Sequence, residues 1–180
     1  MNKIIAIVGM CGSGKSVASE ILVDKGYERV YFGGVTMDKL KEKGLEVTPE
    51  NEKMMREKLR EDLGMGAFAR ILLPKIKELS LKNLVVLDGL YSWDEYKILS
   101  DEFKKQLVTI AIVCDKKTRY NRLKTREERP LTMAQARDRD LAEIENIAKA
   151  PPIAYADYYI FNNGTLEDYK NRLEEILKQI

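Results

Sequence analysis

The chain has 180 residues, of which 31 are Lys or Arg and 29 are Asp or Glu, so its formal net charge is only +2. With 44% hydrophobic residues, this composition predicts one compact domain over residues 1–180 and argues against disorder, nucleic-acid binding and attachment to a membrane surface. The chain has no histidine and two cysteines far apart, Cys11 and Cys114, which excludes a Cys/His zinc site and a histidine general base.

Five short apolar runs, separated by helical patterns, predict the fold. They cover residues 3–8, 28–32, 84–88, 107–113 and 158–161. Strands that alternate with helices form parallel sheets, so we expect an α/β protein with a parallel sheet. No run approaches the roughly 18 residues of a membrane span, and the N-terminus lacks the layout of a signal peptide, which predicts a cytoplasmic protein.

The first strand leads directly into GMCGSGKS, residues 9–16, which fits the pattern G-x-x-x-x-G-K-[S/T] of a phosphate-binding loop. Backbone N–H groups of residues 12–16 can converge on one anion at the start of the next helix. We expect Lys15 to contact the β- and γ-phosphates of a nucleotide and the Ser16 hydroxyl to bind Mg²⁺. The predicted nucleotide-binding residues of this segment are Gly9, Gly12, Ser13, Gly14, Lys15, Ser16 and Val17.

A charged helical insertion, residues 35–64, separates the second and third strands, and Thr48 before Pro49 marks the start of a helix within it. The third strand ends at Asp88, which is followed by Gly89. A GTPase switch would need D-x-x-G here and N-K-x-D elsewhere, and a motor ATPase would usually follow the aspartate with a water-activating glutamate. Neither pattern is present, which favours phosphoryl transfer to an enclosed acceptor.

An arginine-rich segment, residues 119–140, follows the fourth strand. Charge runs are usually solvated faces, and acidic neighbours could pair with several of these arginines: Glu127, Glu128, Asp138 and Asp140. Downstream of a nucleotide site, however, arginines on a flap are the expected means of neutralising a migrating phosphoryl group. We assign this role to Arg122, Arg126 and Arg137.

Capping patterns in the second half of the chain predict where helices begin. Ser92 with Glu95 and Thr132 with Gln135 fit capping boxes, and Thr165 with Asp168 is a near match. The last segment, TLEDYKNRLEEILKQI, places its apolar residues on one face, which predicts a helix packed on the sheet.

Five motifs along nearly the whole chain resemble, in this order, the P-loop nucleotide kinases: GMCGSGKS, GGVTMDKLKEKGLEVTPEN, LDGLYSWDEY, RLKTREERP and ADYYIFNNGTLEDYKNRL. The chain looks closest to the nucleotide-kinase-related proteins that stand between adenylate kinase and dephospho-coenzyme A kinase. The resemblance implies a three-layer P-loop NTPase fold with five parallel strands, a substrate-binding insertion at about residues 35–64 and a closing lid at about residues 126–138. It also implies that Asn163 and Gly164 lie against the adenine of ATP, although Asn-Asn-Gly-Thr equally fits a turn before a capped helix.

Two positions depart from the adenylate-kinase pattern. Met37 and Tyr91 stand near the places where those kinases carry arginines for the acceptor phosphate, which argues against a plain nucleoside monophosphate as acceptor. Tyr91 and Trp93 fit either stacking on the acceptor or packing at the rim of the core. Three arginines are possible substitutes, although the first two could instead form surface pairs: Arg56, Arg60 and Arg70.

Two functions remain open from the sequence. The first is an ATP- and Mg²⁺-dependent kinase that acts on a nucleotide or nucleotide-containing small molecule, such as a nucleoside monophosphate-like or dephospho-coenzyme-A-like acceptor. Its catalytic residues would be Lys15, Asp88, Arg122, Arg126 and Arg137, with Ser16 and Asp88 at the metal. The alternative, favoured by the missing acceptor arginines, is an ATP-binding regulatory module or weak ATPase that controls a protein partner. We expect a monomer or a homodimer.

Overall fold

The computed structural model describes residues 2–127 and 129–180, so Glu128 of the predicted lid lies outside the described residues. Five parallel strands form one sheet in the order β2-β3-β1-β4-β5. Their bounds are Ile4–Val8 for β1, Glu28–Tyr31 for β2, Val85–Asp88 for β3, Leu107–Val113 for β4 and Tyr158–Phe161 for β5. The five predicted strands are confirmed, because apolar runs bounded by polar segments are a local signal.

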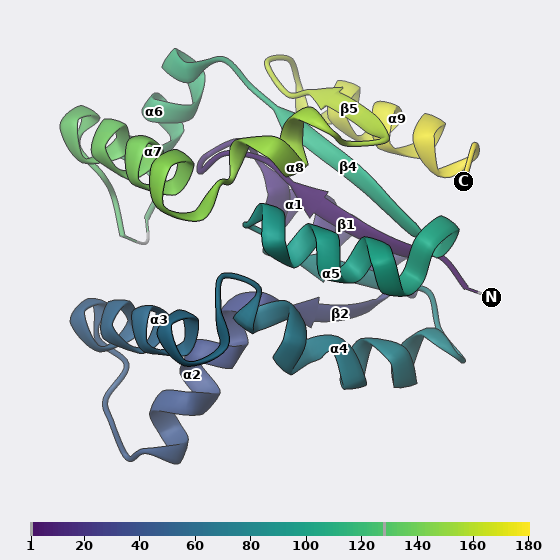
Figure 1. The fold of residues 1–180 in the computed structure, drawn as a ribbon. Helices are drawn as coiled ribbons and strands as arrows, with labels where there is room; N and C mark the ends of the chain where they lie inside the picture. The colour runs from purple at the N-terminus through teal and green to yellow at the C-terminus, as the bar shows by residue number, and fades with distance from the viewer. Residues whose placement is uncertain (1, 128) are drawn as a thin grey trace.

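Both faces of the sheet are buried, which explains why β1 is a continuous apolar run. Ile5 and Ile7 pack on one side with Leu22 of α1 (Lys15–Asp24) and Leu173 of α9 (Leu166–Leu177). The alternate residues of β1 face the other core, which includes α4 (Ala67–Ser80) and α5 (Trp93–Phe103). Figure 1 shows α5 in front of the sheet and α1 behind it, so the fold is a three-layer α/β arrangement.

Two helical segments extend from the end of the sheet at which the strands terminate. The first contains α2 (Phe32–Glu42) and α3 (Pro49–Leu63) and includes the predicted insertion. The second contains α6 (Lys116–Thr125) and α7 (Met133–Ile147), which together carry the arginine-rich segment. In Figure 1, α3 and α7 lie at the same end of the molecule, with α7 above β1 and α3 below it in this view. Among the described residues, no helix combines the length and apolar character needed to span a membrane.

Local side-chain caps fix where four helices begin. Thr48 accepts a hydrogen bond from the Asn51 N–H at the start of α3, where Pro49 occupies the first turn. Full capping boxes start α5, α7 and α9, through Ser92 and Glu95, Thr132 and Gln135, and Thr165 and Asp168. These predicted caps are confirmed, and the aspartate of the last box reaches back as the usual glutamate would. A short 3₁₀ turn, Lys104–Gln106, and a five-residue helix, α8 (Ala150–Ala154), complete the chain.

Candidate functional site

The loop between β1 and α1 curls so tightly that only glycine fits at two of its positions. Gly12 and Gly14 have φ angles of +80° and +101°, in the region that other residues rarely adopt. A Cβ atom at Gly12 would lie 2.9 Å from the Arg119 carbonyl oxygen, and one at Gly14 would collide with the side chain of Asn162. The loop therefore has one conformation in which its N–H groups gather at the N-terminus of α1.

Residues far along the chain hold this loop in place. The Asn162 amide donates a hydrogen bond to the Ser13 carbonyl oxygen at 2.8 Å, and the Tyr169 hydroxyl donates to the Gly14 carbonyl oxygen at 3.0 Å. Sequence reasoning missed both residues, because neither belongs to the loop motif. Asn163 and Gly164 directly follow Asn162, and the Asn163 side chain accepts a hydrogen bond from the Asp115 N–H at 2.9 Å. The two predicted adenine contacts therefore lie next in the chain to a residue that touches the loop.

Lys15 lies at the end of the loop, as the first residue of α1, and its side chain is half-buried. The ammonium group donates to the Met10 carbonyl oxygen at 3.0 Å and makes no ion pair within the described residues. Burial and the nearby charge of Lys149 lower the pKa of Lys15 to about 7. Ser13 carries a buried hydroxyl oxygen without a hydrogen-bond partner in the described structure. A cation without a counter-ion and an unpaired hydroxyl are the features expected of a phosphate site.

Asp88, at the end of β3, is only 6% exposed and accepts a hydrogen bond from the Arg29 side chain on the neighbouring strand β2. Asp88 lies opposite Ile7 of β1 in the sheet, so it stands at the strand end next to the one that leads into the phosphate-binding loop. Arg29 was not foreseen, since nothing in the sequence marks it as a partner of Asp88.

A magnesium ion could be held by a small part of this arrangement. Ser16 is exposed at the first turn of α1, and the Asp88 carboxylate ends the strand next to β1. Hydroxyl and carboxylate oxygens are ligands that Mg²⁺ prefers. No cluster of three or more acidic, Cys or His residues occurs in residues 2–127 or 129–180, so phosphate oxygens and water would complete the coordination.

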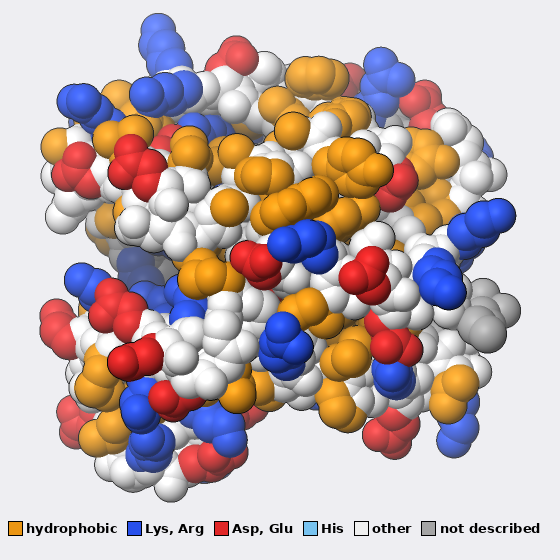
Figure 2. All heavy atoms as spheres, in the orientation of Figure 1, with side chains coloured by type: hydrophobic (Ala, Val, Ile, Leu, Met, Phe, Trp, Pro, Cys, Tyr) orange, Lys and Arg blue, Asp and Glu red, His pale blue; other side chains and the backbone are white. Residues whose placement is uncertain are grey.

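A cavity of about 970 Å³ opens between α3, α7 and the segment after β3, where Gly89 directly follows Asp88. Figure 2 shows the hollow on this side of the molecule, with Lys and Arg side chains visible inside it. Apolar and aromatic side chains also contribute to its wall: Phe32, Met37, Met65, Phe68, Tyr91 and Leu131. Charged side chains of both signs complete it: Glu52, Lys53, Arg56, Glu57, Arg60, Glu95, Arg126, Arg129, Arg139 and Glu143.

The predicted arginines do not all reach this cavity. Arg126 lines it and donates through Nε to the Arg129 carbonyl oxygen at 2.7 Å. Arg122 instead donates to the Asn162 carbonyl oxygen at 3.1 Å, beside the phosphate-binding loop. Arg137 is exposed and is not part of the cavity wall. Arg139, two residues further along the same helix, lines the cavity. The sequence showed an arginine-rich helix but could not show which of its faces would be turned inward.

Lys149 packs behind the cavity wall, and sequence reasoning did not single it out. It is 2% exposed, its Nζ lies 2.6 Å from the Glu143 carboxylate, and it lies 4.5 Å from the centre of the Tyr91 ring. Burial alone would raise the pKa of Glu143, but Lys149 and Arg139 outweigh burial and hold this pKa below its ordinary value. Two cations therefore share one carboxylate at the wall of the cavity.

The two aromatic residues after β3 have different surroundings. Tyr91 lines the cavity, whereas Trp93 is outside its wall and stacks on Tyr96, with ring centres 5.1 Å apart and planes inclined by 6°. The edge of Tyr155 completes this aromatic cluster, at 5.8 Å from Trp93. Of the two interpretations of Trp93, packing at the rim of the core is confirmed.

Comparisons with known proteins agree with this geometry. Residues 5–146 match a family described as an AAA domain. A UPF0200 protein of Sulfurisphaera tokodaii is 36% identical to the chain over 184 residues, which cover 99% of this chain and 97% of the relative.

Solved structures show a similar fold at lower identity. The protein TT1252 of Thermus thermophilus aligns over 99% of this chain and 98% of its own, with a TM-score of 0.66 and 20% identity. Shikimate kinase of Bacteroides thetaiotaomicron aligns over 98% of this chain and 97% of its own, with a TM-score of 0.61 and 12% identity. The chain therefore belongs to the UPF0200 proteins and to the AAA-domain family, and its fold is that of the P-loop kinases.

Proposed function

We propose that the chain is an ATP- and Mg²⁺-dependent phosphotransferase that moves the γ-phosphate of ATP to a small-molecule acceptor. One observation carries the proposal: the wall of the charged cavity includes Gly89, directly after Asp88, and the strand that ends at Asp88 pairs with β1, which leads into the phosphate-binding loop. The ammonium group of Lys149 contacts Tyr91 and Glu143, which also line the cavity. A donor held by the loop would direct its terminal phosphate toward a space large enough for an acceptor.

The side chains of the site suit positioning and charge stabilisation, which are the main demands of phosphoryl transfer. The loop N–H groups and Lys15 would hold the β- and γ-phosphates of the donor. Mg²⁺, bound by Ser16 and through water by Asp88, would offset negative charge on those phosphates. Asp88, kept in place by Arg29, would also orient the hydroxyl group of the acceptor.

Two segments would enclose the acceptor within a single domain, residues 1–180. In this proposal the insertion, residues 35–64, binds the acceptor, and the lid, residues 126–138, closes over it. Closure would keep water from competing for the γ-phosphoryl group. The contact between Glu52 of α3 and Arg129 supports this arrangement, because it joins the two segments across the cavity.

The acceptor we favour is a nucleotide or nucleotide-containing molecule larger than AMP. Met37 and Tyr91 line the cavity where the related kinases would place arginines. Each lost charge-assisted contact costs about 1.5 to 3 kcal/mol, so the two losses taken by themselves weaken binding of a bare monophosphate by about two powers of ten or more. A larger acceptor would regain affinity by covering Met37 and Tyr91.

A steady-state panel of AMP, CMP, UMP, GMP, their deoxy forms and dephospho-coenzyme A tests the acceptor. We expect AMP to be poor and a larger acceptor to gain one phosphate by mass spectrometry when a metabolite pool is added with Mg-ATP. Turnover of a simple monophosphate with kcat/KM near 10⁶ M⁻¹s⁻¹, roughly the value of an efficient enzyme, would contradict the roles given to Met37 and Tyr91. ADP release at the same slow rate with every acceptor would favour the regulatory module instead.

A further inference from the structure

The cavity contains six cationic side chains, and most of them are already engaged with oxygen atoms of the protein. Glu52, only 7% exposed, is shared by two of them: Arg56 lies 3.2 Å and Arg129 lies 2.8 Å from its carboxylate oxygens. Arg139 pairs with Glu143 at 3.1 Å. Each of these three arginines already has a carboxylate in contact with it.

The remaining cations differ in their surroundings. Arg126 donates to the Arg129 carbonyl oxygen, and Lys53 is an exposed side chain 3.9 Å from Glu57. The side chain of Arg60, on the same helix as Arg56, makes no ion pair and no hydrogen bond among the described residues. Its Nε is buried without a partner.

Arg60 is therefore a half-buried guanidinium group without a counter-ion in contact among residues 2–127 and 129–180. Burial lowers the pKa of Arg60 from its ordinary value. The negative charge of Glu95 opposes this lowering, although Glu95 and Arg60 form no ion pair within the described residues. One oxygen of Glu95 is already occupied, because it accepts hydrogen bonds at 3.0 Å from the N–H groups of Tyr91 and Ser92. A partly desolvated cation in this state is unfavourable until an anion binds to it.

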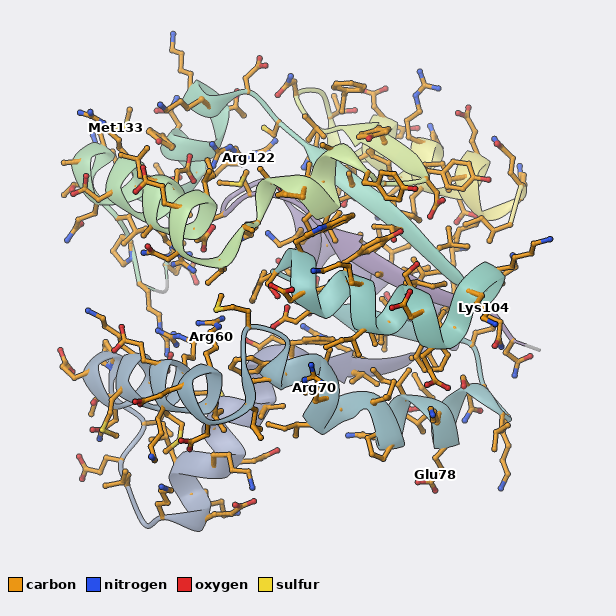
Figure 3. The ribbon with its side chains drawn as sticks, viewed as in Figure 1. Arg60, Arg70, Glu78, Lys104, Arg122 and Met133 are labelled. Atoms are coloured by element: carbon orange, nitrogen blue, oxygen red, sulfur yellow. The ribbon has the colours of Figure 1, made fainter. Side chains whose placement is uncertain are left out.

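The guanidinium group also lies over an aromatic ring. Cζ of Arg60 lies 5.2 Å from the centre of the Phe68 ring, and Phe68 is itself buried at 4% exposure. The guanidinium group of an arginine carries a fork of N–H groups that matches two oxygens of one phosphate. Figure 3 shows Arg60 on the side of α3 that faces the lid segment, whereas Arg70 belongs to α4 and is exposed outside the cavity wall.

We propose that Arg60 binds a phosphate group of the acceptor, in place of the arginines that Met37 and Tyr91 replace. This inference rests on the proposed function and extends it: the acceptor is a phosphate-bearing molecule, anchored from α3. It also decides among the three candidate arginines, since Arg56 is paired with Glu52 and Arg70 lies away from the cavity. The Phe68 and Tyr91 rings then lie within the same cavity as apolar surface for the rest of the acceptor.

The test uses inorganic phosphate as the probe and the arginine Nε–H resonances of ¹⁵N-labelled full-length protein as the readout. The resonances are assigned through bonds on the wild-type chain, so no variant has to fold. Saturating Mg-ADP occupies the phosphate-binding loop during the titration. We expect the Arg60 resonance to shift and saturate with phosphate, while the resonances of Arg56 and Arg70 stay in place.

Chloride at matched ionic strength is the control for screening, and acetate tests for a carboxylate ligand. A stationary Arg60 resonance overturns the proposal, as does an equal response to acetate, which would assign the site to carboxylates. As a second measurement, Arg60→Gln should weaken phosphate binding by about tenfold or more, judged by the amide resonance of Phe68, and Arg56→Gln should not. Because this readout involves no turnover, it stands or falls separately from the acceptor panel.

Discussion

At the scale of single residues, two lysines that do not touch affect the charge of the site. The charge of Lys149 makes the protonated form of Lys15 less favourable, and Lys149 shares the Glu143 carboxylate with Arg139. Among the described residues, no carboxylate is in contact with Lys15 to compensate its positive charge. A polyphosphate bound at the loop would supply this compensation, which is why we place the donor there.

Lys15→Ala is expected to reduce phosphoryl transfer by roughly a hundredfold or more, since loss of one contact to transferred charge costs a few kcal/mol at the transition state. The free energy of unfolding should change little or rise, because the variant removes a desolvated charge rather than a packed side chain. Single-turnover assays and urea denaturation measure the two effects. Wild-type transfer in the purified variant would refute the role of Lys15.

Some residues of the site could be predicted from the sequence, and others could not. The loop residues could be predicted because the glycines, Lys15 and Ser16 form one contiguous pattern after a strand. Asn162 and Lys149 could not, because their roles depend on contacts made across the fold with the loop and with Glu143. The same limit separates Arg137 from Arg139: composition marks the helix, but only packing decides which face lines the cavity.

At the scale of elements, α3 and the segment before α7 are joined by one carboxylate. Glu52 is buried on α3, and the Arg129 side chain that reaches it is 62% exposed. An ion pair of this exposure contributes at most about 1 kcal/mol, enough to bias closure of the segment without locking it. The approach of these elements was not predictable from local patterns, whereas the caps that begin α3 and α7 were.

Glu52→Gln should therefore loosen this contact while leaving both helices intact. We expect amide hydrogen exchange in residues 129–139 to accelerate by up to roughly fivefold, which corresponds to about 1 kcal/mol. The matched control is Glu57→Gln on the same helix, whose contact with Lys53 is 3.9 Å and stays within α3. Equal exchange in the two variants would mean that Glu52 does not hold the lid segment.

At the scale of the whole molecule, residues in and next to the last strand and helix support the phosphate-binding loop near the N-terminus. Tyr169 of α9 is 2% exposed, and its hydroxyl donates to Gly14, while α9 also packs on the core beside β1. The five-stranded sheet follows from alternating apolar runs, but its order and the contact between the two ends of the chain depend on tertiary packing. Nucleotide binding is therefore a property of the entire described fold.

Tyr169→Phe tests this dependence by removing one hydroxyl group. The lost hydrogen bond should lower the free energy of unfolding by about 1 kcal/mol and weaken binding of a fluorescent ATP analogue several-fold, because the Gly14 carbonyl is left unpaired. Tyr159→Phe is the control, since its hydroxyl donates to the Ala154 carbonyl oxygen at 2.7 Å, apart from the loop. If both variants bind the analogue as the wild type does, α9 does not support the loop.

The hydrogen bonds from Asn162 and Tyr169 to the loop also have a consequence for biosynthesis. A ribosome releases the GMCGSGKS motif early, but the two side chains that hold its backbone emerge about 150 residues later. A nascent chain that stops before β5 has the motif without its supports, and the edge of β4 remains uncovered. Occupancy by nucleotide would then distinguish finished molecules from interrupted ones, and would protect only the former against proteolysis.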